Sequence, residues 1–255
     1  MHGVVHALWP NTNVRQNPHN VVQRPQKFVG LIAALLLFPG CAKSPDSLLK
    51  SAATKCERSD YPGAIADCSE AIRLNPQLPE AFVWRGIARA RVGDTDAAIS
   101  DFDEAIRLNP KSFKAYSDRS VVWQQKGDYA KAVSDATEAI RLNPKDAEAY
   151  YNRGLSRGRS ADYSGSVADL TEAIQLNPND PEYYCNRGIS LERQGEYQKA
   201  IPDFTEAIQL RTNYAKAYFY RSVARERTGD HMGAVSDSNE VVRIDPQVYR
   251  KQAGQ

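Results

Sequence analysis

Apolar side chains follow three different patterns along the chain. Residues 1–27 show no apolar periodicity, contain no Asp or Glu, and are rich in Asn, Gln, Pro and His, so they are not expected to build a core. Residues 28–38 form a short apolar run. From residue 45 to residue 248, aromatic, small and charged positions recur every 34 residues. A repeat of this length predicts an array of similar supersecondary units over most of the chain.

The apolar run at 28–38 is 11 residues long, with Arg24 and Lys27 before it and Gly40-Cys41 after it. A membrane-spanning helix needs about 20 apolar residues. The apolar core of a secretory signal needs only about 7–15, with a basic flank before it and small residues after it. The run therefore predicts that residues 1–40 are a signal or leader segment.

The Gly40-Cys41 pair resembles the end of a bacterial lipoprotein signal, although the two residues before it differ from the usual Leu and small residue. The resemblance implies cleavage before Cys41, lipidation of Cys41 and a short linker at 41–44. It also implies a protein anchored in the bacterial envelope and facing the periplasm. The outer membrane is favoured because Ala42, and not Asp, follows the cysteine. Alternatives are a plain secretion signal that yields a secreted or soluble periplasmic protein, an uncleaved anchor, and a buried cysteine after a short apolar helix.

Proline supplies a regular marker of the 34-residue period. A near-copy of the sequence Glu-Ala-Ile-Arg-Leu-Asn precedes it in unit after unit, and Thr212 stands where one unit lacks it. Because the residue before a proline disfavours helical angles, each Asn-Pro pair predicts the end of a helix. The marker prolines are Pro76, Pro110, Pro144, Pro178 and Pro246.

An aromatic residue and a small residue also recur at fixed places in the units. The aromatic column, at the fourth position, consists of Phe82, Tyr116, Tyr150, Tyr184 and Tyr218. The small column, at the eighth position, consists of Ala52, Gly86, Ser120, Gly154, Gly188 and Ser222. These columns, together with two helical stretches per 34 residues, resemble the tetratricopeptide repeat (TPR) family.

The resemblance implies an all-α fold, a right-handed α-α superhelix of about six helix-turn-helix repeats. Small residues allow two antiparallel helices to approach closely, and stacked hairpins bury a continuous core in a solenoid with a concave inner face. A tail at 249–255 follows the array. The expected repeats are 45–78, 79–112, 113–146, 147–180, 181–214 and 215–248.

The two helices of a repeat are separated by a glycine and an acidic residue in four units. Glycine tolerates the left-handed conformation that ends a helix, and the acidic residue favours the positive start of the next one. The pairs are Gly93-Asp94, Gly127-Asp128, Gly195-Glu196 and Gly229-Asp230.

An aspartate column and an arginine column recur together. Catalytic carboxylates and an anion site are alternatives, but charges paired in unit after unit favour a structural ion pair between helices. The columns are Asp67, Asp101, Asp135, Asp169, Asp203 and Asp237, and Arg85, Arg119, Arg153, Arg187 and Arg221.

In the TPR family the first helix of each repeat lines the groove, so the resemblance implies that its inward positions bind a partner. Asn152 and Asn186 occupy the sixth position of consecutive repeats. An amide offers both a donor and an acceptor to a peptide backbone, so we expect this pair to contact a peptide or else to be solvated polar surface. The aromatic candidates are Trp84, Tyr151, Phe219 and Tyr220.

Composition gives no support for catalysis. Only His231 lies beyond the leader, and neither a phosphate-binding glycine loop nor a nucleophile elbow appears. The chain is therefore predicted to be no enzyme and to use no cofactor and no metal. Its net charge of +2 lacks the basic excess of a nucleic-acid binder. Among the cysteines, Cys68 is expected in the core, Cys185 at the groove or its edge, and a Cys56–Cys68 disulfide is not expected.

The predicted function is a non-catalytic scaffold that binds a protein or an extended peptide in its concave groove at the bacterial cell envelope. Two alternatives stay open at this point. One is a structural, oligomerising envelope protein that assembles through its terminal repeats. The other is a regulatory adaptor of a cell-wall or secretion enzyme, whose catalytic residues lie on another chain.

Overall fold

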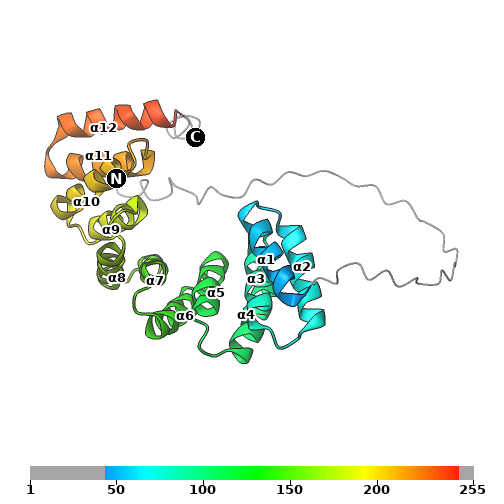
Figure 1. Ribbon diagram of the computed structural model, residues 1–255. Helices are drawn as coiled ribbons and strands as arrows, with labels where there is room; N and C mark the ends of the chain where they lie inside the picture. Colours follow the sequence, from blue (N-terminus) through cyan, green and yellow to red (C-terminus); the bar gives the residue numbers. More distant parts are fainter. Residues whose placement is uncertain (1–43, 247–255) are drawn as a thin grey trace, which may run out of the picture. The chain divides into compact units, whose positions relative to one another are not determined.

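The computed structural model describes residues 44–246, and every regular element in this range is an α-helix (Figure 1). These helices follow one another as six hairpins, so the predicted all-α solenoid of helix-turn-helix repeats is confirmed. The hairpins are α1 (Pro45–Glu57) with α2 (Tyr61–Leu74), α3 (Pro79–Arg91) with α4 (Thr95–Leu108), α5 (Phe113–Lys126) with α6 (Tyr129–Leu142), α7 (Ala147–Arg159) with α8 (Tyr163–Leu176), α9 (Pro181–Arg193) with α10 (Tyr197–Leu210), and α11 (Ala215–Thr228) with α12 (His231–Ile244).

The helices form two layers with different neighbours. The two helices of a hairpin pack together, and each second helix packs against the first helix of the next hairpin. Successive first helices also contact one another, whereas no two second helices do so within residues 44–246. Closer spacing on one side curves a stack of repeats toward that side. The first helices therefore line the concave face. We use the term odd-helix face for the surface of these helices that is turned away from the even-numbered helices.

Aspartate and glycine define the turn inside each hairpin. The N-cap carboxylates of α2, α4, α6, α8 and α12 each accept a hydrogen bond from the backbone N–H three residues later. The four predicted turn glycines have φ values between 78° and 88°, which is the left-handed region. These turns are thus confirmed, except that Glu196 makes no side-chain cap. In the first and fourth hairpins Ser59 and Ala161 take the glycine's place, with φ values of 62° and 64°.

Asparagine ends α2, α4, α6 and α8, as the Asn-Pro markers predict. Its side chain turns the backbone: Asn75 Oδ1 accepts from the Gln77 N–H at 3.1 Å. The repeat that lacks the marker is joined to the next one differently. Arg211 Nη1 lies 2.8 Å from Glu182 Oε1, and the Tyr214 hydroxyl donates to Glu182 Oε2 at 2.5 Å. An ion pair and a hydrogen bond thus replace the asparagine turn at that junction.

Small residues at the eighth position permit close contact between the helices of a hairpin. A Cβ added at Gly86 would lie 2.9 Å from Cε1 of Phe102, and one added at Gly188 would lie 2.7 Å from Cε1 of Phe204. Both phenylalanine rings are fully buried. The rings therefore occupy the space that a larger eighth residue would need.

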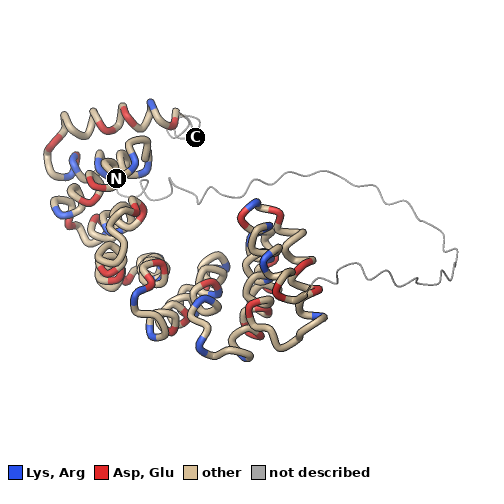
Figure 2. The backbone as a smooth tube through the Cα atoms, in the orientation of Figure 1, with Lys and Arg blue, Asp and Glu red and all other residues tan. Residues whose placement is uncertain are grey.

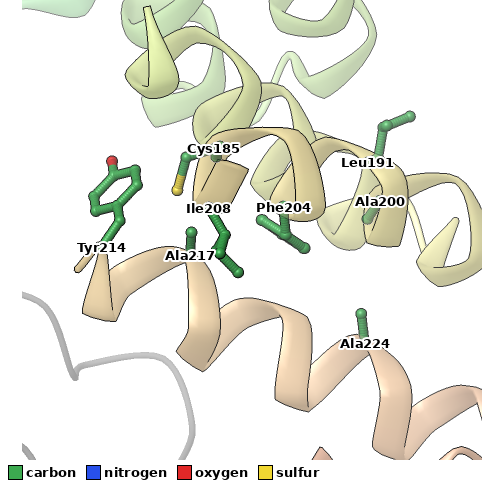
Figure 3. Packing of buried hydrophobic residues seen from close by; sticks show 9 residues of the cluster. Cys185, Leu191, Ala200, Phe204, Ile208, Tyr214, Ala217 and Ala224 are labelled. Carbon is green, nitrogen blue, oxygen red and sulfur yellow. The ribbon is translucent and has the colours of Figure 1, made fainter. Parts of the chain in front are cut away.

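The core around Phe204 also contains Cys185, which packs with Ile208 and Ala217 between α9, α10 and α11 (Figure 3). The prediction that Cys185 faces the groove or its edge is wrong, because its side chain is fully buried and its thiol is hydrogen-bonded to Tyr214. Cys68 is buried as predicted. Both cysteines, like Cys56, are free thiols.

The arginine and aspartate columns form the predicted ion pairs between the two helices of a repeat. Each arginine approaches the aspartate 16 residues later with an Nη2–Oδ1 distance of 2.7 Å. In the first repeat Ser51 takes the place of the column arginine, and Ser51 and Lys55 contact Asp67 at 2.6 Å and 2.5 Å. These carboxylates are structural groups buried between helices.

Candidate partner-binding face

The odd-helix face carries one row of side chains at the sixth position of the repeats, one from each first helix. Because the repeats are related by a constant 34 residues, this position recurs at the same level of every first helix. We call these residues the sixth-position row. They are Lys50, Trp84, Asp118, Asn152, Asn186 and Tyr220.

Trp84 lies on α3 and is partly buried. The ammonium group of Lys114, from α5, lies 4.3 Å from the centroid of its ring. A cation over an indole face is attracted by the ring's quadrupole. The Trp84 ring is thus already in contact with a basic side chain of the neighbouring repeat.

Asn186 uses its side-chain amide within the protein. Its Nδ2 donates to the Tyr151 hydroxyl at 3.2 Å and to the Glu182 carbonyl at 2.8 Å, and its Oδ1 accepts from Lys216 Nζ at 3.1 Å. The Tyr151 ring in turn packs against Tyr183, with centroids 4.9 Å apart. Burial and the acidic side chains nearby raise the pKa of Tyr151, so its hydroxyl stays protonated. The two predicted site residues Tyr151 and Asn186 are therefore brought together, mainly by bonds to each other and to α9 and α11.

Phe219 and Tyr220 pack into the last part of the core. Phe219 is buried, with 8% of its surface exposed, and meets the Tyr220 ring edge-on at 5.3 Å. Tyr220 also stacks on Phe204, with centroids 6.0 Å apart. Of these two candidate site residues, only Tyr220 has an appreciable solvent-exposed surface.

Asn152 differs from Asn186 although both occupy the same position of the repeat. Asn152 is 6% exposed, and its Nδ2 is buried without a hydrogen-bond partner. Its backbone carbonyl accepts from Gln124 Nε2 at 2.9 Å and from Ser156 Oγ at 2.9 Å. A buried amide nitrogen without an acceptor is unfavourable by about 1–3 kcal/mol, and the protein itself leaves this donor unsatisfied.

Asp118, on the neighbouring first helix α5, is the residue that sequence reasoning missed as a site. Its Oδ2 is buried without a hydrogen-bond partner. Burial raises the pKa of the Asp118 carboxyl to about 7; Lys114 and Arg91 oppose this shift, while Glu148 and Asp146 add to it. At neutral pH this carboxyl is therefore divided between its acid and its carboxylate.

A second buried acid lies farther along the same layer. Glu192, on α9, has a buried Oε2 with no hydrogen-bond partner. Burial raises the pKa of Glu192 to about 7, against the opposing charges of Arg193 and Arg227.

Over the array as a whole, basic and acidic residues are interspersed along both layers (Figure 2).

A hollow of about 450 Å³ lies outside the sixth-position row. It is formed by the turn between α9 and α10 and by the end of α11. Its lining consists of Gly195, Glu196, Tyr197, Gln198, Lys199, Arg227 and Thr228. It contains none of the candidate site residues.

Sequence profiles agree with the helical hairpins. Profiles described as Tetratricopeptide repeat match residues 56–113, 84–147 and 181–214, and one described as TPR repeat matches residues 162–195. The chain belongs to the tetratricopeptide repeat (TPR) family. No curated protein matches its sequence.

Solved TPR structures share the fold at low sequence identity. Pseudomonas aeruginosa pilF is 16% identical, with a TM-score of 0.73 over 83% of this chain and 97% of its own. YrrB, described as a TPR protein with an unusual peptide-binding site, is 19% identical, with a TM-score of 0.61 over 74% of this chain and 98% of its own. MamA from Desulfovibrio magneticus RS-1 is 24% identical, with a TM-score of 0.60 over 67% and 96%. Identities this low show a common TPR fold and nothing finer.

All the candidate site residues except Cys41 lie within the TPR array. Cys41 and the predicted signal lie outside the described residues. Within 44–246, no helix has the length and apolar character needed to cross a bilayer. The same range holds no cluster of His, Cys, Asp and Glu that could bind a metal ion.

Proposed function

We propose that this TPR protein is a non-catalytic scaffold that binds a protein or an extended peptide along its odd-helix face. The observation that carries the proposal is the unsatisfied amide nitrogen of Asn152 on that face. Buried polar groups in proteins normally have a partner, and a peptide backbone offers a carbonyl acceptor at every residue. The peptide-binding site named for YrrB supports the same use of the fold.

Site-specific photocrosslinking tests this proposal. A benzoyl-phenylalanine at Glu148, which is exposed on α7, should capture a partner of another chain, and Asn152→Ala should abolish that adduct. The matched control position is Met232 on α12, which is 87% exposed and lies off the odd-helix face. Equal adducts from both positions, or an adduct at Glu148 that ignores Asn152→Ala, would refute binding on the odd-helix face.

A second candidate function is end-to-end assembly of this chain. It is favoured by the last helix, α12, where Met232, Val235 and Val242 are 87%, 62% and 47% exposed. Within residues 44–246 this helix packs only against α11, and exposed apolar side chains on the outer helix of an array favour association. The crosslinker at Met232 separates the two functions, because assembly predicts adducts of this chain with itself at Met232 and none at Glu148. A regulatory adaptor would instead give an enzyme as the adduct at Glu148.

We also propose that Cys41 is lipidated and anchors the TPR array to the bacterial envelope, facing the periplasm. The support is the sequence alone: a basic flank, an 11-residue apolar run and Gly40-Cys41. Palmitate labelling that is lost in Cys41→Ser, and processing that is blocked by globomycin, are the expected results. Secretion of the unlabelled wild-type protein into the soluble fraction would contradict the anchor and favour a plain secretion signal.

A further inference from the structure

We infer that Asp118 and Asn152 form one subsite of the odd-helix face that binds a basic residue of an extended peptide. The ammonium or guanidinium group of the basic residue pairs with Asp118, and a backbone carbonyl of the same segment accepts from Asn152. This inference rests on the proposed function, and it names the chemistry of the partner at one point of the face.

Asp118 and Asn152 occupy equivalent positions in the repeat, but one has an unsatisfied hydrogen-bond acceptor and the other an unsatisfied donor. They occupy the sixth position of consecutive repeats, on α5 and α7, and these two helices contact each other. Asp118 leaves a buried acceptor, Oδ2, without a donor, and Asn152 leaves a buried donor, Nδ2, without an acceptor. A ligand that satisfies both must supply a donor and an acceptor together. The next member of the row, Asn186, is already satisfied by protein groups.

The charges around Asp118 select a cationic donor over a neutral one. The groups that act on it are Lys114, Arg91, Glu148 and Asp146. With Asp118 ionised, this set holds two positive and three negative charges, so one added cation balances it. Lys114 lies over the Trp84 ring, and Asp118 Oδ2 has no hydrogen-bond partner. A charge-assisted hydrogen bond to a buried carboxylate is about twice as strong as a neutral one.

The placement of the two groups on neighbouring helices also suits a long basic side chain. They stand on different helices, and packed helices have their axes about 8–10 Å apart. The flexible stem of Lys or Arg carries a cation well away from its own backbone carbonyl. One basic residue in an extended segment therefore provides both groups.

Binding of this kind is linked to a proton. The Asp118 pKa of about 7 reflects a buried carboxyl that no cation fully compensates. A bound cation favours the carboxylate and lowers that pKa, so the complex releases a proton as it forms. Affinity then rises with pH, by about tenfold between pH 6 and pH 8 for a group that titrates near 7.

The experiment begins with the purified full chain and a positional-scanning library of N-acetylated, C-amidated hexapeptides. At pH 8, Lys and Arg should be enriched at one library position, by about tenfold over norleucine and citrulline. Asp118→Asn should remove this preference and leave binding at the other library positions. Glu80→Gln, which changes an exposed carboxylate on α3, is the matched control and should keep the preference. Thermal unfolding by circular dichroism establishes that each variant is folded.

Titration of the selected peptide and of its norleucine or citrulline version then tests the linkage. The basic peptide should bind about tenfold more tightly at pH 8 than at pH 6, the neutral version should show no such change, and Asn152→Leu should weaken both. A basic preference that persists in Asp118→Asn would overturn the inference, as would hexapeptides that bind with no basic preference. In the latter case the adducts at Glu148 would still stand, so binding on the odd-helix face would survive. Absence of both peptide binding and adducts would overturn the inference and the proposed function together.

Discussion

Arg85 and Asp101 tie the two helices of the second repeat together through a short, largely buried ion pair. Arg85 Nη2 lies 2.7 Å from Asp101 Oδ1, and the side chains are only 16% and 4% exposed. Arg89 Nη1 adds a second contact, 2.8 Å from Asp101 Oδ2. The aspartate thus compensates two cations, and its removal leaves both without their partner.

Asp101→Asn should therefore destabilise the array strongly. Removal of one member of a buried ion pair typically lowers the free energy of unfolding by about 3–5 kcal/mol, because the partner's charge is left uncompensated. Urea unfolding followed by circular dichroism measures the loss. Glu104→Gln on the same helix is the control, since Glu104 pairs with Arg107 at the surface and should leave the midpoint nearly unchanged. Similar midpoints for the two variants would show that the ion-pair column contributes little.

The turns of the hairpins allow a test in both directions. Ala161 has a φ of 64° where other repeats carry glycine, and a left-handed non-glycine residue costs about 1–2 kcal/mol. Ala161→Gly should therefore raise the free energy of unfolding by about 1 kcal/mol. The reverse change, Gly195→Ala at a φ of 80°, should lower it by a similar amount. Shifts of the same sign in both variants would contradict this explanation.

The repeat pattern predicts these features well because they recur. The ion pairs follow from two columns 16 residues apart, and the helix ends follow from Asn-Pro and Gly-Asp pairs. The periodicity of one sequence suffices for the fold, since each hairpin meets neighbours that resemble itself.

The candidate site was predicted less completely, because it depends on side chains that differ between repeats. Asn152 and Asn186 look identical in sequence, yet Tyr151 and Lys216 satisfy only the second. Asp118 occupies the same repeat position as these two asparagines, and only the packed helices show that its Oδ2 lacks a partner. Cys185 was misplaced for a similar reason, since the side chain that covers it, Tyr214, belongs to the one junction without the proline marker.

The three cysteines within residues 44–246 should differ sharply in reactivity. Burial raises the pKa of the Cys68 thiol to about 12 and that of Cys185 to about 11, whereas Cys56 is only partly buried. Since the thiolate is the reactive form, iodoacetamide at pH 8 should label Cys56 well before the other two. Peptide mass spectrometry resolves the three sites, and labelling in guanidinium chloride should make their rates similar. Rapid labelling of Cys185 in the folded protein would contradict its burial beneath Tyr214.

Asp118 should make the stability of the array depend on pH in the direction opposite to that of a salt-bridged carboxylate. The folded protein keeps the Asp118 proton up to a pKa of about 7, whereas an unfolded aspartate loses it near pH 4. Between these values the folded state binds more protons, so its stability falls as pH rises. Asp118→Asn stays neutral at every pH. The free energy of unfolding of the variant, relative to that of the wild type, should therefore increase from pH 5 to pH 8, by about 1–3 kcal/mol in total. Urea unfolding of the two proteins across this range measures the difference in their free energies of unfolding. For Glu80→Gln, the difference from the wild type should not change with pH. A flat difference for Asp118→Asn as well would mean that its carboxyl is solvated and titrates normally.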